Sequence, residues 1–163
     1  MAATGCQSRV TTPTARFADN ERKRFIRVQA IATHRITTAA PDLLAILATY
    51  IQSVEEQTIL AITSKIVALC QGRVVPMADA DRQALIQAEA DYFLPPGASR
   101  YGVTLTLKEN LLTPNAGIDE SNADGAYVLW PHEPQQVADD VRAWLCRHFG
   151  RQQVGVIITD SAP

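Results

Sequence analysis

The sequence predicts a mixed α/β domain of the α+β class, and three observations support this class. Segments typical of strands alternate with segments typical of helices along residues 25–163. Hydrophobic residues make up 47% of the 163 residues, which is enough for one core without disulfides or structural metals. Proline and glycine residues stand at the borders of several of these segments. The order strand, helix, strand, helix, strand, helix, strand leaves the topology open.

The first 24 residues are expected to form a flexible tail, and the domain is expected to occupy residues 25–163. The tail is rich in Ser, Thr and Ala and lacks a clear apolar face, which favours a disordered segment over the alternative of a transit-like presequence. A strand is predicted from Phe25 to Ile31. A helix is predicted from Pro41 to Glu55, because its apolar residues recur at helical spacing and Pro41 suits a first turn.

An apolar run rich in Ile and Thr predicts a buried strand from Thr58 through Ile62. It is followed by Thr63, Ser64 and Lys65, where the strand is expected to give way to a helical turn. The small hydroxyl residues there are suited to cap backbone amides, and the same amides with the Ser64 hydroxyl are suited to hold a phosphate oxygen. The segment contains no GxxxxGK[ST] motif, which excludes a P-loop.

The remaining elements follow from the same kind of pattern. A helix from Glu133 to Phe149 is the clearest of them, since Pro134 stands at its start and Gly150 just beyond its end. The other predicted elements are a helix from Asp79 to Tyr92, a strand from Val103 to Leu107 and a strand from Val154 to Ile158.

The segment TPNAGIDESNADG, from Thr113 to Gly125, carries most of the functional information. Gly117 and Gly125 permit backbone angles or close approaches that a side chain forbids. The segment also supplies oxygen donors and amides suited to a cation beside a phosphorylated ligand, namely Asn115, Asp119, Glu120, Ser121, Asn122 and Asp124. The alternative is an ordinary polar surface loop, because the same residue types dominate turns for conformational reasons.

The last predicted strand ends at Thr159, Asp160 and Ser161. Ligands in open α/β sheets usually bind at the carboxyl ends of buried strands. These three residues are therefore candidates for the same site as Ser64, which also follows a buried strand.

Three motifs in this order and spacing carry a resemblance to a known family. The segment TSKIV with Gln71 to Arg73, the segment NAGIDESN and the late ITDS together resemble the coenzyme F420-0:L-glutamate ligase family. The resemblance covers residues 27–161. It implies a GTP-dependent amide ligase that adds L-glutamate to a cofactor precursor, either F420-0 in coenzyme F420 biosynthesis or a folate-like acceptor in folate metabolism.

The resemblance also implies roles for particular residues. Asp119, Asp160 and Ser161 would bind a divalent metal, and Ser64 and Asn122 would contact the guanine nucleotide. Two carboxylates about 5 Å apart repel each other by roughly 3 kcal/mol at an effective dielectric near 20, and a shared cation reverses this. Hard oxygen donors favour magnesium or manganese, while no pair of His or Cys residues has the spacing of zinc ligands.

The chain departs from the family pattern in three places. Leu69 stands where the family commonly has a second Lys that touches the nucleotide phosphates, and losing that contact would cost roughly 1.5 to 3 kcal/mol. The early nucleotide-contacting turn, usually Ile-Pro or Leu-Pro, is here the segment from Ile31 to His34. Family members continue well beyond the position of Pro163, so the domain is expected to be incomplete at its carboxyl end. These departures favour the alternative of a non-catalytic nucleotide- or metal-binding module, or an inactive truncated relative.

Charge and cysteine content limit the partners and the compartment. A net charge of −2 gives no general attraction to nucleic acid or to anionic lipid. No apolar run reaches transmembrane length. Three widely spaced cysteines without a CxxC motif indicate free thiols in a reducing compartment, which is consistent with a cytoplasmic protein. The resemblance further implies a homodimer that binds small-molecule substrates.

Overall fold

A computed structural model describes residues 15–17, 24–38, 42–98, 100, 102–120 and 125–160. The chain forms two compact units, residues 1–32 and residues 33–163. In the first unit, β1 (Ala15–Phe17) pairs antiparallel with β2 (Arg24–Ile26). The predicted strand from Phe25 to Ile31 is therefore confirmed only at its beginning, since residues 27–31 belong to no described strand.

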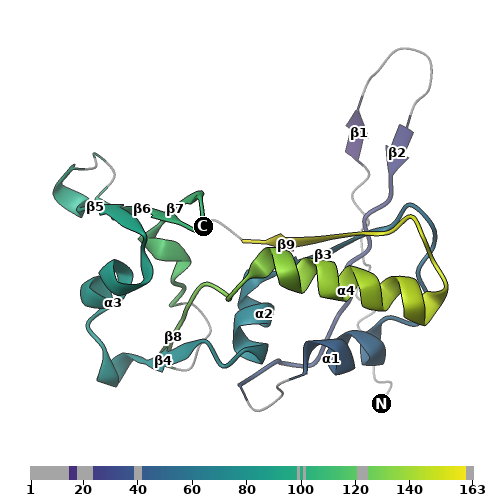
Figure 1. Cartoon of the computed structure of the whole chain (residues 1–163), viewed down its shortest axis with the longest axis horizontal. Coiled ribbons are helices and arrows are strands. Elements are labelled where there is room, and N and C mark those ends of the chain that lie inside the picture. Colours follow the sequence, from purple (N-terminus) through teal and green to yellow (C-terminus); the bar gives the residue numbers. More distant parts are fainter. Residues whose placement is uncertain are drawn as a thin grey trace, which may run out of the picture. The chain divides into compact units, whose positions relative to one another are not determined.

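The second unit contains the mixture of helices and short sheets that the sequence predicts, which confirms the α+β class (Figure 1). Its helices are α1 (Leu43–Tyr50), α2 (Ser64–Cys70), α3 (Arg82–Glu89) and α4 (Pro134–Phe149), with 3₁₀ turns η1 (Met77–Asp79), η2 (Pro96–Ala98) and η3 (Asn115–Gly117). Its strands are β3 (Ile59–Thr63), β4 (Val74–Pro76), β5 (Tyr92–Leu94), β6 (Leu105–Lys108), β7 (Leu111–Pro114), β8 (Ala126–Val128) and β9 (Gly155–Thr159).

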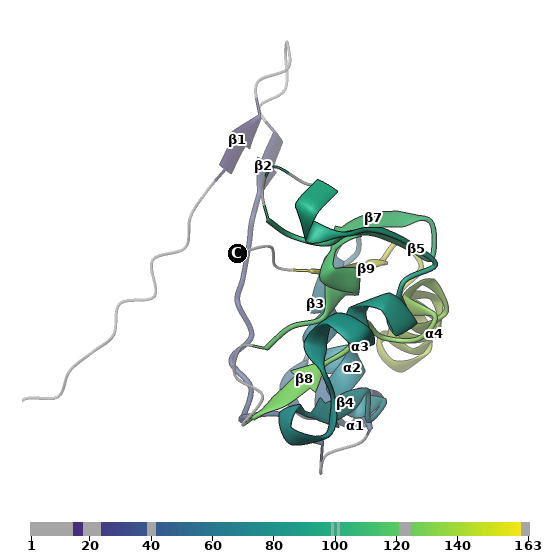
Figure 2. The same cartoon turned by 90° about the vertical axis from the view of Figure 1, so that its left-hand side faces the viewer.

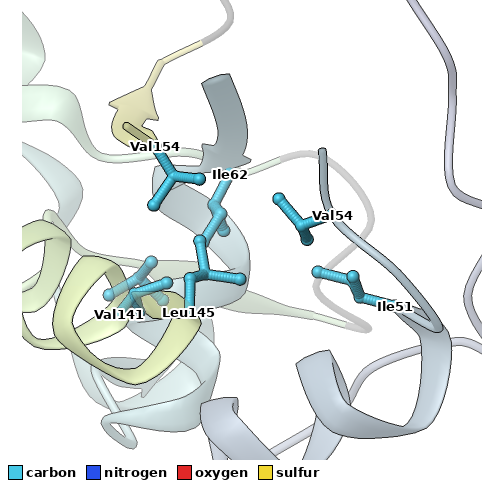
Figure 3. Close-up of a cluster of buried hydrophobic side chains, with 7 residues drawn as sticks. Ile51, Val54, Ile62, Val141, Leu145 and Val154 are labelled. Carbon is cyan, nitrogen blue, oxygen red and sulfur yellow. The ribbon is translucent and has the colours of Figure 1, made fainter. Parts of the chain in front are cut away.

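Two lobes with separate apolar clusters make up this second unit. The helical lobe, residues 42–72 and 131–160, consists of α1, α2, α4 and the parallel pair β3–β9. Figure 1 shows α4 lying along this strand pair. Its buried core draws apolar side chains from β3, α2, α4 and the segments beside α1 and β9 (Figure 3), namely Ile51, Val54, Ile62, Val67, Val141, Leu145 and Val154. Partly buried side chains of α1 and β9, such as Leu47 and Ile158, pack against it.

One face of the β3–β9 pair lies outside this core. Ile59 is 65% exposed and Ile157 is 49% exposed, while Ile62 and Val154 are buried. The strands predicted at residues 58–62 and 154–158 are confirmed as strands. The prediction that they are buried is correct for one face only, because the described part of the chain covers just one side of the pair.

Helix α4 agrees closely with its prediction. Pro134 occupies its first turn, where the missing backbone N–H has no intrahelical acceptor to lose. Gly150 adopts a left-handed φ of 64° and its N–H bonds to the carbonyl of Cys146, which ends the helix. Arg147 and His148 lie in the last turn, where positive charge complements the helix dipole.

The sheet lobe, residues 73–130, has a different construction. It contains the antiparallel pair β4–β8 and the antiparallel sheet β5–β6–β7, with α3 between them in both views of the molecule (Figures 1 and 2). Its apolar cluster is smaller than that of the helical lobe and consists of Ile86, Ala116, Ile118, Tyr127 and Leu129.

The β5–β6–β7 sheet turns its polar residues inward. Thr106 and Thr113 are buried on one face, where the Thr106 hydroxyl donates to the Thr113 carbonyl at 2.5 Å. On the other face Tyr92 is 73% exposed and Leu112 is 71% exposed, and both are paired in register with Leu107. The sheet therefore presents an apolar surface, which is the reverse of the usual arrangement in a half-buried sheet.

A partly buried charge cluster joins α3, β6 and the residue that precedes β4. The Glu89 carboxylate at the end of α3 receives the Arg73 guanidinium at 2.5 Å and the Lys108 ammonium at 2.8 Å. Burial raises the pKa of Glu89, but the hydrogen bonds from Lys108 and Arg73 outweigh this effect, and the pKa lies below its ordinary value. Arg73 also donates to the carbonyl of Trp130, so the cluster fixes the segment that follows β8.

Two predicted helices are shorter in the structure than in the prediction. The helix predicted from Pro41 to Glu55 ends at Tyr50, because the following residues turn to an extended conformation that buries Ile51 and Val54 in the core. Its beginning is fixed by Asp42, whose carboxylate accepts from the backbone N–H of Leu44.

The helix predicted from Asp79 to Tyr92 spans only Arg82 to Glu89. Asp81 caps its beginning through the backbone N–H of Ala84. Tyr92 belongs to β5 instead, because its strand pairs with β6.

Candidate functional site

The parallel pairing of β3 and β9 brings two predicted site residues together. Thr63 lies opposite Thr159 in the register, so the carboxyl ends of the two strands coincide. Ser64 and Asp160 follow directly, and the Ser64 hydroxyl donates to Asp160 Oδ1 at 3.1 Å. Two residues 96 positions apart in sequence thus form one contact at the edge predicted for a ligand.

The predicted capping role of the hydroxyl residues is wrong for Thr63. This residue is the N-cap of α2, yet its side chain makes no capping hydrogen bond. The buried Ser64 hydroxyl uses its proton for Asp160 instead. The predicted helical turn is also longer than expected, since α2 continues to Cys70.

Residues 115–119, the NAGID segment, approach the site with an unusual backbone conformation. Asn115, Ala116 and Gly117 adopt positive φ values of 53°, 53° and 69° in succession. The backbone N–H of Ala116 is held by the buried Thr106 hydroxyl at 2.8 Å. A Cβ at Gly117 would lie 2.5 Å from Cε3 of Trp130, so only glycine fits against this indole ring.

Asp119 is fixed by this segment and by β8. Its backbone exchanges two hydrogen bonds with Val128, each 2.9 Å long. Its carboxylate forms an ion pair with Lys65, with 2.5 Å between Oδ2 and Nζ. Asp119 from the sheet lobe therefore contacts the first turn of α2 in the helical lobe.

The two predicted metal-binding acids consequently contact adjacent residues. Asp160 binds Ser64 and Asp119 binds Lys65, and consecutive Cα atoms lie only about 3.8 Å apart. Both acids thus contact the start of α2. Their role as metal ligands stays a prediction.

Two other predicted site residues, Asn122 and Ser161, lie outside the described residues. Within the described part of the chain, no group of three or more His, Cys, Asp and Glu side chains is arranged to hold a metal ion. A metal bound by Asp119 and Asp160 would therefore need further oxygen ligands, such as Ser161, that are not His, Cys, Asp or Glu side chains of the described residues.

Sequence reasoning did not assign Lys65 to the site. Lys65 follows Ser64 directly, and the side chains of neighbouring residues on a helix point in different directions. The signal that identifies it is three-dimensional, since its partner Asp119 lies 54 positions further along the chain. A second ion pair lies beside it, between Arg82 at the start of α3 and Glu120.

Trp130 was also not predicted. It is buried against Gly117, and its indole Nε1 has no hydrogen-bond acceptor among the described residues. In contrast, His34 from the early turn contacts the hydroxyl of Tyr50 through its backbone N–H at 3.0 Å and through Nδ1 at 2.6 Å. This contact ties His34 to α1.

The chain can now be compared with known proteins. The family described as F420-0:Gamma-glutamyl ligase matches residues 31–163, which is most of the chain and includes every residue of the site described above. The chain belongs to the F420-0:gamma-glutamyl ligase family. The family resemblance inferred from the three motifs is thereby confirmed.

One curated relative in this family is the coenzyme F420:L-glutamate ligase of Methanopyrus kandleri. It is 28% identical to this chain over 152 residues, which cover 83% of this chain and 60% of the relative. The chain thus spans about 60% of the length of that protein. Among the described residues of this family member, no helix is long and apolar enough to cross a membrane.

Proposed function

We propose that this chain supplies the metal- and nucleotide-binding part of a GTP-dependent γ-glutamyl ligase. The observation that carries the proposal is the gathering of Asp119 and Asp160 at Ser64 and Lys65. Family membership and the relative's name support a ligase that acts on a coenzyme F420 precursor and L-glutamate. A folate-like acceptor is the alternative, because no described residue discriminates between the two.

The residues present fit a divalent metal. Asp119 Oδ2 already contacts the Lys65 ammonium, so a metal at this oxygen would have to share or displace that contact. Asp119, Asp160 and Ser161 offer only oxygen donors, which suits Mg²⁺ or Mn²⁺. When bound, such an ion neutralises charge on the phosphoryl oxygens during transfer.

The proposed reaction has two steps. An oxygen of the acceptor carboxylate attacks the γ-phosphorus of GTP, the bond to the bridging β,γ-oxygen breaks, and GDP leaves. The amine nitrogen of L-glutamate then attacks the acyl phosphate, forms the amide bond and releases inorganic phosphate, and its surplus proton passes to solvent. Ser64 and Asn122 are proposed to contact the guanine nucleotide, and the protein's part is to position these groups.

The proposed partners follow the same reasoning. A homodimer is supported by the apolar face of the β5–β6–β7 sheet, since exposed side chains such as Tyr92 and Leu112 mark surfaces that associate. Sedimentation equilibrium of the chain measures this directly, and a monomer at all concentrations would contradict it. A GTP-using ligase without affinity for nucleic acid or membrane fits the cytoplasm.

Calorimetric titration with Mn²⁺ and GTP tests the assignment, together with release of phosphate in the presence of L-glutamate and F420-0. Asp119→Ala and Asp160→Ala should each weaken Mn²⁺ binding at least tenfold and abolish phosphate release. Asp139→Ala is the matched control, because this acid lies on the exposed face of α4 and contacts only Gln135 in a described hydrogen bond. Unchanged Mn²⁺ binding in both site variants would contradict the proposal.

A non-catalytic binding module is the second candidate. It is favoured by Leu69, which replaces the phosphate-contacting lysine with an apolar side chain. Binding of Mn²⁺ and GTP without phosphate release, with either acceptor, would support the module over the enzyme. No heat in either titration would contradict both.

A further inference from the structure

Two ion pairs stand side by side on the segment that follows the NAGID turn. Lys65 holds Asp119, and Arg82 holds the next residue, Glu120. The two pairs differ in one respect, because only Asp119 is a proposed metal ligand. Lys65 is thus a resident cation on a carboxylate that a metal would also need.

The contacts described for the site involve three charged side chains. Asp119 and Asp160 contribute two negative charges and Lys65 contributes one positive charge, so these three side chains sum to −1. Arg82 and Glu120 cancel each other. A divalent ion would bring the sum for these groups to +1 with Lys65 in place, and to 0 without it.

The Lys65–Asp119 pair is partly protected from water. The Lys65 side chain is 25% exposed and the Asp119 side chain is 33% exposed. A second cation at the same carboxylate would therefore be repelled more strongly than at a free surface, although solvent still screens part of the effect. A bound polyphosphate would remove this repulsion, because its anionic oxygens can accept hydrogen bonds from the Lys65 ammonium in place of the Asp119 carboxylate.

We infer that Lys65 opposes binding of a bare divalent metal at Asp119 and makes that binding depend on an accompanying polyphosphate. This inference rests on the proposed function. It assigns Lys65 a positioning role, in which the ammonium moves from the Asp119 carboxylate to the phosphate oxygens of the nucleotide. It also supplies a cationic phosphate contact in a chain that has Leu69 at the family's lysine position.

The test is Mn²⁺ binding to the full chain, measured from the electron paramagnetic resonance signal of free Mn²⁺. The measurement is made with and without the β,γ-imido analogue of GTP. Lys65→Met should bind bare Mn²⁺ roughly three- to tenfold more tightly than the wild type, as expected for loss of a partly exposed competing charge. The gain in Mn²⁺ affinity on adding the nucleotide should shrink by a similar factor in this variant.

Two further variants test whether the effect depends on a positive charge at position 65. Arg82→Gln removes the same charge from the neighbouring pair and should leave the Mn²⁺ affinity within twofold of the wild type. Lys65→Arg retains the charge and should keep most of the nucleotide dependence. Circular dichroism melting of each variant establishes that it is folded.

The outcomes separate this inference from the function on which it rests. If Asp119→Ala binds Mn²⁺ as well as the wild type does, no metal binds at Asp119 and both proposals fail. If Asp119→Ala loses Mn²⁺ but Lys65→Met binds it no more tightly than the wild type, only the role of Lys65 is overturned. An equal gain in Lys65→Met and Arg82→Gln would also overturn it, because the effect would then be general electrostatics.

Discussion

The helical lobe and the sheet lobe each supply one acid to the candidate site, but different forces hold them together. Asp160 follows β9 in a lobe whose apolar core draws on all of its helices and both of its strands. Asp119 belongs to a lobe with a smaller apolar cluster. Hydrogen bonds of buried threonines and the ion pairs of Glu89 also hold the elements of this lobe together. Apolar packing tolerates small displacements, whereas a polar network needs every partner in place. The position of Asp119 should therefore be the more easily disturbed of the two.

The largest effect is expected from breaking the core of the helical lobe. Leu145→Ala removes a side chain that is almost fully buried between α4 and the strand pair, and should lower the free energy of unfolding by about 3 to 4 kcal/mol. Urea denaturation measures this change. Leu145→Met conserves volume and should cost under about 1.5 kcal/mol. Equal losses in both variants would show that cavity formation is not the cause.

A somewhat smaller effect is expected from breaking the charge cluster of the sheet lobe. Glu89→Gln leaves Arg73 and Lys108 with no anionic partner in the cluster, and should cost about 2 to 3 kcal/mol at pH 7. The matched change Glu55→Gln, at an exposed position, should cost less than about 0.5 kcal/mol. Urea midpoints for the three proteins provide the comparison.

The contribution of Glu89 also has a defined pH dependence. Its pKa in the folded state is below the ordinary value of 4.5, so the folded protein binds fewer protons than the unfolded chain. The stabilisation is therefore complete above that value and is lost as the pH falls through the lower folded pKa. The stability difference between wild type and Glu89→Gln should shrink below pH 4.5, and a difference that grows on acidification would contradict this assignment.

Gly117→Ala should have the smallest effect on stability of the three site and core variants, but it should displace Asp119 the most. Gly117→Ala places a methyl group against Trp130 and adds strain at a positive φ, with an expected cost of about 2 kcal/mol. Gly72→Ala has a similar φ of 68° with no atom within 4 Å of the new Cβ, so it isolates the backbone strain. Mn²⁺ affinity should fall in Gly117→Ala and stay unchanged in Gly72→Ala. A loss in both variants would show that the Trp130 contact is not responsible.

The two lobes also differ in how far their sequences predict them. The helix at residues 134–149 and the strands near 59–63 and 155–159 carry long apolar patterns with clear end signals, and these predictions are confirmed. The strands of the sheet lobe have three or four residues each, which is too short to show an alternation of apolar and polar residues. The strand predicted from Val103 to Leu107 corresponds to β6, and it does not lead directly into the NAGID segment. Instead the chain first reverses at Glu109 and Asn110, both at positive φ, and forms β7.

The candidate site, too, could be predicted from the sequence only in part. Its residue types and motifs could be read from the sequence, and so could the position of Asp160 and Ser64 at strand ends. The ion pair of Lys65 with Asp119 and the packing of Trp130 on Gly117 could not, because each joins residues whose proximity depends on how the sheet lobe packs. Asn122 and Ser161 remain predictions.

The parallel pairing of β3 with β9 has a consequence for synthesis of the protein on the ribosome. A nascent chain that has emerged only as far as α4 already contains Ser64, Lys65 and Asp119, but the edge of β3 that β9 will occupy has no partner yet. Ligand affinity should therefore arise late and abruptly, when residues 155–160 emerge and close a loop of about a hundred residues. Until then β3 exposes an apolar strand edge, which is the form most prone to aggregate and most dependent on chaperones.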